Sequence, residues 1–338
     1  MKNRKKKALI VVPAQTGKGG VFNFYENLKI YLPATYDLYY LNGTLNSGGL
    51  KKTATIFNHF RSIFRNLNTK EYSKVILNPS LNLNSVLRDS LVAMMSNLLG
   101  VEVVVFWRGW NFKNEKFLKF PFSIITSYLL KPKNTLVLYS KISSSLKKLG
   151  FKGNVFLMTT LVNNDAFKYE INDKIKSLKI IFLSRVENYK GVFELLEAYK
   201  VLKQKHNNIS LTIAGSGSAL PEVKKTIKTQ KIKDVNVPGY VVGTKKYELL
   251  AGSNIFIFPS YSEGMPNAVL ESMAIGLPVI TTKVGGLNDF FEDKKMGYFI
   301  EIKNANSIVK TLEEVIYNNE IISEIKQYNI NFAKTHFR

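Results

Sequence analysis

The sequence contains no cysteine and only three histidines among its 338 residues. The absence of cysteine excludes disulfides, thiolate metal sites and cysteine nucleophiles, and it is compatible with a reducing cytosol. Because His59, His206 and His336 lie far apart along the chain, a histidine-rich metal centre is not expected. The chemistry of this chain is therefore expected to rest on other side chains.

The sequence also lacks a long apolar run. The longest, Phe117–Leu130, is interrupted by a lysine and a proline and is shorter than the roughly 20 residues that cross a bilayer. The basic segment Met1–Lys7 and the apolar segment Ala8–Val12 superficially resemble a secretory leader, but the apolar part is too short and Pro13 ends it. We expect a first β-strand behind a basic tail, and no membrane-spanning segment.

Acidic residues are scarce, with 25 Asp and Glu against 48 Lys and Arg, which gives a net charge of +23. The imbalance lies in residues 1–160, which carry 24 basic and 6 acidic residues, whereas the rest carries 24 and 19. Such a charge attracts an anionic membrane surface, a nucleic acid or a diphosphate-bearing substrate. The alternative is that lysine merely fills the surface.

The length and the 45% hydrophobic content predict two α/β domains of ordinary size. Strands alternate with helical patterns, which predicts parallel sheets with helices on both faces, and this pattern runs twice. The expected strands are Ala8–Val12, Tyr36–Tyr40, Lys74–Leu77, Val101–Phe106, Thr135–Leu138, Asn154–Leu157, Lys179–Leu183, Ser210–Ala214, Val235–Val237, Asn254–Phe258, Pro278–Thr281 and Tyr298–Ile300. The polar stretch Asn163–Ser177 is expected to link domains over residues 1–163 and 164–338.

The segment Phe258–Glu271 predicts a buried strand, a loop, and a helix that begins at Pro266 and runs to about Gly276. The first free amides of that helix and its partial positive charge suit a phosphate group, and a glycine in the loop lets the backbone approach a ligand. The residues expected to line this binding site are Gly264, Met265, Pro266, Asn267 and Ala268.

Two carboxylates flank these residues. Glu263 is expected in the loop and Glu271 about a turn and a half into the helix, where they reach separate hydroxyl-bearing parts of one long ligand. Taken singly, Glu263 could merely complement the helix dipole and Glu271 could be an exposed helical residue. Together with the loop and Pro266, they favour a sugar-binding function.

The sequence Glu-Gly-Met-Pro-Asn-Ala-Val-Leu-Glu from Glu263 to Glu271 resembles the Glu-x7-Glu signature of retaining glycosyltransferases of family 4, which have the GT-B fold. The resemblance covers nearly all of the second half and, more thinly, the first. It implies two Rossmann-like domains whose sheets face a central cleft, and a last helix that crosses back to the first domain. It also implies that Glu263 holds the donor sugar and Glu271 the ribose.

The stretch Leu183–Gly191 is similar to the family's strand-end motif. Arg185 follows a predicted strand and Lys190 precedes a helical pattern, so both can offset a diphosphate and the charge that grows on it during cleavage. The alternative is a surface arginine and a lysine at a helix start. Weaker matches to the family are Gly215 in the glycine loop after a strand, Tyr240 and Val241 near the nucleobase, and the turn at Gly285-Gly286.

In the first half, the loop that contains Gly19 and Gly20 follows the first strand and precedes a helical pattern. It fits neither the dinucleotide fingerprint nor a Walker loop, and it resembles the family's amino-terminal glycine loop. After the strand Val101–Phe106, Arg108 stands where many relatives have an active-site histidine. Arginine cannot act as a base, so Arg108 would act by positioning or by charge. Trp107 and Trp110 would stack on an acceptor or pack in the core.

Basic and aromatic residues coincide in two segments of the first half, Leu50–Leu67 and Lys113–Lys133. Such stripes contact a bilayer interface or bury against a sheet. No metal-binding Asp-x-Asp motif is recognisable, so transfer without metal or other cofactor is expected.

As a whole, the resemblance implies a retaining glycosyltransferase of bacterial surface polysaccharide synthesis (capsule, exopolysaccharide or O-antigen). It would be cytoplasmic or peripheral on the inner face of the plasma membrane. Its substrates would be a nucleotide-diphosphate sugar and a saccharide or lipid-linked acceptor. A nucleotide-sugar epimerase or a phosphorylase of the same fold stays open, as does a nucleic-acid-binding protein. Against the last, the basic residues form no recognisable nucleic-acid module, and no nucleic-acid partner is expected.

Overall fold

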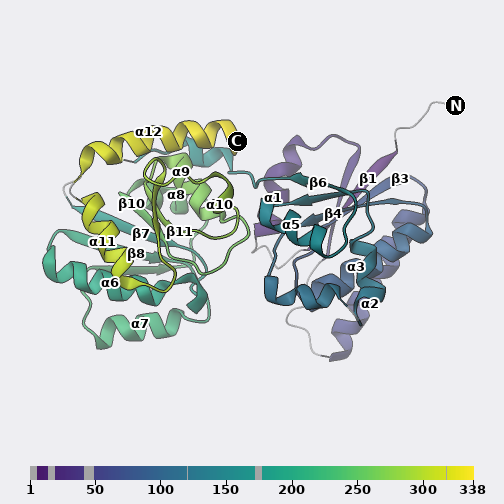
Figure 1. Ribbon diagram of the computed structural model, residues 1–338, viewed down its shortest axis with the longest axis horizontal. Coiled ribbons are helices and arrows are strands. Elements are labelled where there is room, and N and C mark those ends of the chain that lie inside the picture. The colour runs from purple at the N-terminus through teal and green to yellow at the C-terminus, as the bar shows by residue number, and fades with distance from the viewer. Residues whose placement is uncertain (1–5, 14–19, 42–48, 120, 172–176, 317) are drawn as a thin grey trace. The chain divides into compact units, whose positions relative to one another are not determined.

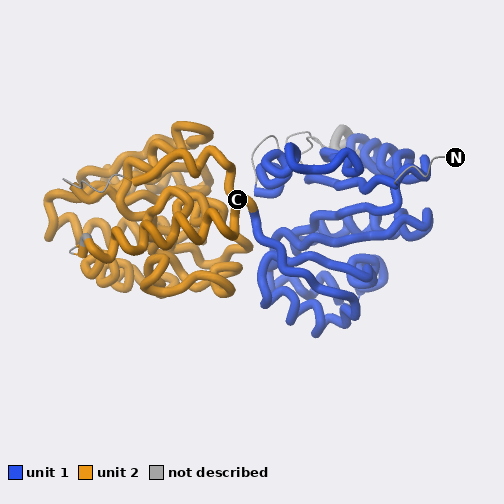
Figure 2. The backbone as a smooth tube through the Cα atoms, turned by 90° about the horizontal axis from the view of Figure 1, so that it is seen from above, with its two compact units in different colours: residues 1–160 blue, residues 161–338 orange. Residues whose placement is uncertain are grey.

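The computed structural model describes residues 6–13, 20–41, 49–119, 121–171, 177–316 and 318–338, with the backbone alone for residues 49–53 and 319. The chain divides into two compact units, residues 1–160 and 161–338, which Figure 2 draws in separate colours. The division lies three residues before the boundary expected from the sequence. Each unit contains its own parallel six-stranded sheet.

The sheet of unit 1 has the strand order β2-β1-β3-β4-β5-β6. Its strands are β1 (Lys7–Val12), β2 (Tyr36–Tyr40), β3 (Tyr72–Leu77), β4 (Glu102–Trp107), β5 (Asn134–Val137) and β6 (Asn154–Leu157). The α-helices between them are α1 (Gly20–Leu28), α2 (Gly49–Asn68), α3 (Leu83–Leu98), α4 (Ser123–Thr126) and α5 (Ser140–Lys148).

The sheet of unit 2 has the order β12-β11-β10-β7-β8-β9. Its strands are β7 (Leu178–Leu183), β8 (Ile209–Ala214), β9 (Val235–Gly239), β10 (Ile255–Phe258), β11 (Val279–Thr282) and β12 (Gly297–Ile300). Its α-helices are α6 (Val192–Lys205), α7 (Leu220–Thr229), α8 (Gly243–Ala251), α9 (Asn267–Ile275), α10 (Leu287–Phe290), α11 (Ala305–Ile316) and α12 (Asn319–His336).

The core of unit 2 shows why its strands are almost wholly apolar. Along β7, Ile180 and Phe182 pack into one hydrophobic cluster, whereas Ile181 and Leu183 pack into another, because successive side chains of a strand point to opposite faces. Helices α6 and α11 contribute to the first cluster, and α8 and α9 contribute to the second. Figure 1 shows these helix pairs on opposite sides of the sheet, with α12 over α9. A sheet covered on both faces needs apolar residues at every strand position.

The predicted architecture is confirmed. Each of the twelve strands expected from the sequence overlaps an observed strand, and the bounds differ by two residues at most. One expectation was wrong: the segment Asn163–Ser177 is not, as a whole, a linker. Its described part belongs to unit 2, where Ala166 and Ile171 are buried and the Ile171 amide donates to the carbonyl of Ile275 at 3.2 Å. The segment has few apolar residues, but these two lie in the core.

No helix in the described residues is both long and apolar enough to cross a bilayer. Helix α12 packs on α9 within unit 2, and the amide of Val162 donates to the carbonyl of Phe337 at 2.8 Å. The last helix therefore ties the start of unit 2 to its end.

Candidate functional site

The carboxyl ends of the strands in unit 2 bring the predicted residues together. The strand order reverses its direction between β7 and β10, so the loops after these neighbouring strands leave the sheet toward opposite sides. Open α/β sheets bind ligands at such a point, outside the carboxyl ends of the strands. Arg185 and Lys190 follow β7, and Glu263 follows β10. Glu263 thus lies at the same edge of the sheet as Arg185 and Lys190, from which it is far apart in sequence.

Lys190 and Glu263 form a buried ion pair at this edge, between Nζ and Oε1. Their side chains are only 6% and 11% exposed, and Ser260 Oγ also donates to Glu263 Oε1 at 2.6 Å. The Lys190 ammonium lies 5.3 Å from the ring centroids of both Tyr189 and Phe258. Low local dielectric strengthens such a pair but makes either charge costly when it stands alone. The sequence predicted both residues in the site but not their direct pairing.

The loops after β7 and β10 are joined by their backbones. The amide of Tyr261 donates to the carbonyl of Tyr189 at 2.8 Å. Gly191 has a φ of +73°, and a Cβ at this position would overlap the carbonyl oxygen of Pro259. Glycine is therefore required where the chain turns from Lys190 into α6. This close approach fixes the Lys190 backbone against the loop that carries Glu263.

The turn after β11 supports the same loop from another side. The amide of Gly286 donates to the carbonyl of Gly264 at 2.7 Å, and a Cβ on Gly285 would overlap the carbonyls of Glu263 and Gly264. The Gly-Gly turn noted in the sequence therefore holds the Glu263 loop in place. Its part in the site is a supporting one.

Helix α9 begins one residue later than expected. Pro266 is its N-cap, with an extended backbone, and the Pro266 carbonyl accepts from the Val269 amide at 3.0 Å. The amides of Asn267 and Ala268 precede this first helical bond and have no intrahelical acceptor, as for any helix start. Both residues are partly exposed, as are Gly264 and Met265. The helix start is thus accessible beside the ion pair.

Glu271 forms a second ion pair, with Lys246 of α8, at 2.7 Å between Oε1 and Nζ. Both side chains are largely covered, at 13% and 19% exposure. Lys246 could not be predicted here from the sequence, because it belongs to a different helix, 25 residues earlier, and no motif spacing points to it. Both glutamates of the signature are therefore paired with lysines.

The loop after β8 lies beside the loop after β7, at the same edge of the sheet. Gly215 has a φ of +143°, its amide donates to the Gly239 carbonyl at 2.7 Å, and a Cβ would overlap the carbonyl oxygen of Ser184. Hydrogen bonds from Ser218 to the Glu187 carboxylate hold the pKa of Glu187 below its usual value. The loops after β7 and β8 therefore form one connected surface.

Arg185 and Tyr240 lie on the outside of this surface. Arg185 is exposed, and its Nη2 donates to the Tyr189 hydroxyl at 2.7 Å. Tyr240, the first residue after β9, is 47% exposed, whereas Val241 is buried in the core of unit 2. Only the first of these two candidate nucleobase contacts thus presents its side chain to solvent.

In unit 1, Arg108 follows β4 as predicted, and its guanidinium lies 4.2 Å and 4.3 Å from the ring centroids of Phe24 and Phe106. Trp107 and Trp110 are core residues that pack edge to face at 5.0 Å, with exposures of 0% and 4%. The alternative that they stack on an acceptor sugar is therefore wrong.

Gly20 begins α1 and has open space around its Cα, whereas Gly19 lies outside the described residues. Within the described part of the chain, no group of three His, Asp or Glu side chains is arranged to hold a metal ion.

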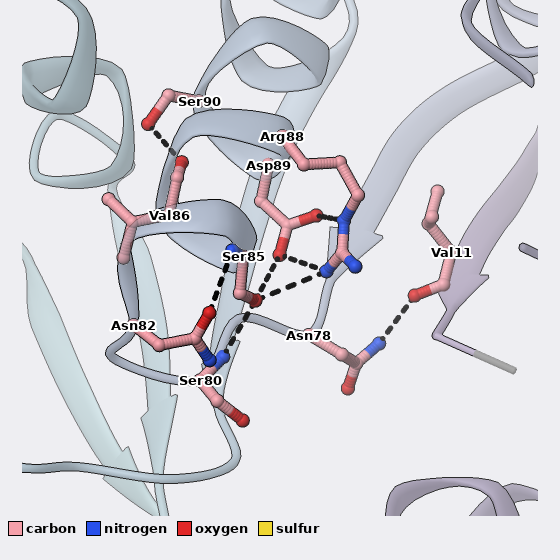
Figure 3. Close-up of polar contacts among 9 residues, drawn as sticks. All are labelled: Val11, Asn78, Ser80, Asn82, Ser85, Val86, Arg88, Asp89 and Ser90. Atoms are coloured by element: carbon pink, nitrogen blue, oxygen red, sulfur yellow. Dashed lines mark hydrogen bonds and ion pairs between the residues drawn. The ribbon is translucent and has the colours of Figure 1, made fainter. Parts of the chain in front are cut away.

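A polar network at the start of α3 holds the loop next to Arg108 (Figure 3). Asp89, which is 1% exposed, accepts from Arg88 Nε and Nη2, both at 2.8 Å. Ser85 Oγ accepts from the backbone amide of Ser80 at 3.1 Å, and Asn82 caps the helix by accepting from the Ser85 amide at 3.0 Å. No signal in the sequence points to this network, because each of its residues is ordinary near a helix start.

Comparison with known structures identifies the fold. The chain is similar to sucrose-phosphate synthase from Thermosynechococcus elongatus, with a TM-score of 0.76 and 14% identity over 99% of this chain and 95% of that one. It is also similar to Anabaena HepE, whose structure is a complex with UDP-glucose, with a TM-score of 0.74 and 13% identity over 98% of this chain and 95% of that one. The two sheets with flanking helices are therefore a GT-B fold.

Residues 163–332 match the family model of the glycosyl transferases group 1, and the chain belongs to this family. A curated relative is the putative teichuronic acid biosynthesis glycosyltransferase TuaC of Bacillus subtilis, 29% identical over 203 residues, which are 56% of this chain and 49% of TuaC. Further relatives are named as glycosyltransferases of capsular polysaccharide and colanic acid biosynthesis. The chain spans about half the length of the curated relatives it matches.

Proposed function

We propose that this chain is a retaining glycosyltransferase of family 4, which transfers a sugar from a nucleotide-diphosphate sugar to a saccharide or lipid-linked saccharide. The observation that carries the proposal is the buried Lys190–Glu263 pair at the point where the strand order of unit 2 reverses. A cation and a carboxylate side by side suit a ligand that carries both phosphate and hydroxyl groups. Membership of the family supports the reaction class.

Different residues of unit 2 bind different parts of the donor. Lys190 and Arg185 bind the diphosphate together with the α9 amides of Asn267 and Ala268, Glu263 accepts hydrogen bonds from the donor sugar, and Glu271 accepts from the ribose. On donor binding, a phosphate oxygen takes the place of the Glu263 carboxylate beside the Lys190 ammonium. No step of this scheme uses a metal ion, and we propose that transfer is metal-independent.

In the transfer step, the bond between the anomeric carbon and the phosphate oxygen breaks, and the acceptor oxygen bonds to the same face of the sugar. The hydroxyl proton of the acceptor passes to the departing phosphate oxygen. Negative charge grows on the nucleoside diphosphate during this step, and fixed cations at that place lower the barrier. Lys190 is suited to this task because its backbone is fixed by the contact of Gly191 with Pro259.

We propose that unit 1 binds the acceptor and that the boundary between the two domains lies at about residue 163. The names of the relatives, which refer to teichuronic acid, capsular polysaccharide and colanic acid, support an acceptor from bacterial surface polysaccharide synthesis. We propose a cytoplasmic location for the chain. An epimerase is less well supported, since the relatives are named as glycosyltransferases.

The donor is tested with a panel of UDP, GDP, ADP and CMP sugars. One nucleotide class is expected to raise the melting temperature, because a ligand at 100 times its Kd stabilises the folded state by about 2.7 kcal/mol. NMR of the product formed from that donor is expected to show a retained anomeric configuration. Absence of stabilisation by every donor contradicts the proposed site, and an inverted product contradicts the mechanism.

A basic aromatic face of α2, formed by Phe57, Arg61, Phe64 and Arg65, supports a peripheral position on an anionic membrane. All four residues are exposed, and Phe57 and Phe64 are 67% and 43% exposed. Their spacing of four, seven and eight residues from Phe57 places them on one side of the helix. An amphipathic face of this kind binds at the lipid interface.

Replacing both Arg61 and Arg65 by Gln is expected to weaken binding to phosphatidylglycerol vesicles by about 10- to 30-fold, since each basic residue near the surface contributes about 1 kcal/mol. Replacing Phe57 and Phe64 by Ser is expected to weaken it further. The matched control is Phe156→Ser, because Phe156 on β6 is also half exposed. Vesicle sedimentation measures the effect, and equal binding by the wild type and the arginine variant contradicts the proposal.

A further inference from the structure

Arg108 in unit 1 is a largely covered cation. Its guanidinium lies against the rings of Phe24 and Phe106, both fully buried, which meet edge to face at 6.0 Å. This burial lowers the pKa of Arg108 to about 10, so the side chain is still charged at neutral pH. Aromatic ring faces attract a cation. They do not supply hydrogen-bond acceptors for the N–H groups, which point outward in the plane of the guanidinium.

Two of the three guanidinium nitrogens, Nε and Nη1, are shielded from solvent and have no hydrogen-bond acceptor among the described residues. Arginine has donors only, so each of these nitrogens needs an acceptor oxygen. An unpaired buried charge is among the costlier features of a folded protein. The fold therefore maintains a cation without a counter-ion among the residues that the structure describes.

Polar side chains of α1, α3 and the loop after β3 have partners of their own. Asp89 in α3 is held by the two hydrogen bonds from Arg88, and the Asn78 side chain donates to the Val11 carbonyl (Figure 3). The Asn78 side chain also accepts from Tyr25. The Tyr25 hydroxyl donates to Asn78 at 2.7 Å, and burial raises the pKa of Tyr25 to about 12, so it supplies no negative charge.

The position of Arg108 is fixed by the loop after β3. Its amide donates to the Pro79 carbonyl at 2.9 Å, and Ser80 and Gly109 form a β-bridge. Ser80 is in turn held through Ser85 by the α3 network. The guanidinium thus stands at the carboxyl ends of β3 and β4, where an open sheet receives its ligand.

We propose that Arg108 binds an oxyanion carried by the saccharide that unit 1 accepts, a carboxylate or a phosphate, so that the acceptor is an acidic sugar. This inference rests on the proposed function and specifies the class of its acceptor. The diphosphate of the donor is not the expected partner, because Arg185 and Lys190 of unit 2 already supply cations for it. A planar guanidinium suits both carboxylate and phosphate oxygens.

The test compares binding of D-glucuronate and D-glucose to the full chain by ligand-observed NMR at low ionic strength. Glucuronate is expected to bind the wild type about 10- to 100-fold more tightly than glucose, as one charge-assisted hydrogen-bonded contact contributes about 1.5–3 kcal/mol. Inorganic phosphate is expected to compete with glucuronate. Arg108→Gln is expected to abolish the preference, and Arg108→Lys to keep part of it.

The matched control is Lys147→Gln, which removes an exposed cation of the same unit and is expected to keep the preference. Thermal melting shows that the variants are folded, and removal of an unpaired charge should not lower the melting temperature of Arg108→Gln. The inference is overturned if the wild type does not distinguish the two sugars or if Arg108→Gln keeps the preference. It is also overturned if Arg108→Gln weakens binding of the nucleotide identified by the donor panel and leaves glucuronate binding unchanged. Failure of the wild type to bind any nucleotide of the panel, with the glucuronate preference intact, would instead contradict the proposed function.

Discussion

Lys190→Met is expected to lower kcat/KM for sugar transfer by about 10²- to 10³-fold, the loss seen when one fixed group that stabilises transition-state charge is removed. The ammonium is buried beside Glu263. Under the proposed function it stands where charge develops on the departing diphosphate. Arg185, the other side-chain cation assigned to the diphosphate, is exposed and donates to the Tyr189 hydroxyl, so we do not expect it to replace the buried ammonium. Steady-state transfer kinetics with the donor identified by the panel measure the effect.

The same variant leaves the Glu263 carboxylate buried without its cation, so thermal unfolding must be measured alongside activity. Removing one partner of a buried pair destabilises by about 3–5 kcal/mol, whereas removing both is much less costly. Lys190→Met combined with Glu263→Gln is therefore expected to recover stability but not transfer. The matched control is Lys205→Met, which breaks the exposed pair with Glu313 and is expected to change neither. Near-normal transfer by a folded Lys190→Met protein contradicts the role assigned to this lysine.

Gly215→Ala is expected to destabilise unit 2 by about 2–6 kcal/mol. Backbone strain contributes about 1–3 kcal/mol, because this conformation is open almost only to glycine. Overpacking by the added methyl group contributes about 1–3 kcal/mol more. The added Cβ would overlap the Ser184 carbonyl, so the loops after β7 and β8 must separate. Because each kcal/mol lowers the melting temperature by about 2–4 °C in a domain of this size, the expected shift is about 5–20 °C.

Gly100→Ala is the control for this prediction. Gly100 also has a positive φ, +68°, but its missing Cβ would meet no atom within 4 Å. The substitution therefore costs only the left-handed conformation, about 1–2 kcal/mol. Calorimetric unfolding of both variants separates the effect of crowding from that of backbone strain. Equal decreases in melting temperature for the two variants would contradict the close approach of Gly215 to Ser184.

The sequence predicted the elements of this fold well, since both sheets are covered by helices and their strands read as short apolar runs. The fourteen residues from Phe258 to Glu271 also predicted the end of strand β10, the loop after it and the start of helix α9 to within one residue. The signal there is local: an apolar strand, a glycine, and a proline that caps a helix. The segment Asn163–Ser177 was misjudged because two isolated apolar residues cannot show from sequence whether they are buried.

Pairings across the sheet could not be predicted. Lys190 and Glu263 are 73 residues apart, and they meet only because β7 and β10 are neighbours, which depends on the strand order. Lys246 pairs with Glu271 for the same kind of reason, through the packing of α8 on α9. The sequence placed Arg108 after β4 but not between two phenylalanine rings, since only tertiary structure shows what surrounds a side chain.

The ion pair between Lys190 and Glu263 has a consequence for turnover under the proposed function. A complete donor can replace both halves of the pair at once, with a phosphate oxygen for the lysine and sugar hydroxyls for the glutamate. The nucleoside diphosphate left after transfer has no such hydroxyls, so the carboxylate competes with it for the ammonium. Re-formation of the internal pair then favours departure of the spent nucleotide and returns the enzyme to its resting state for the next cycle.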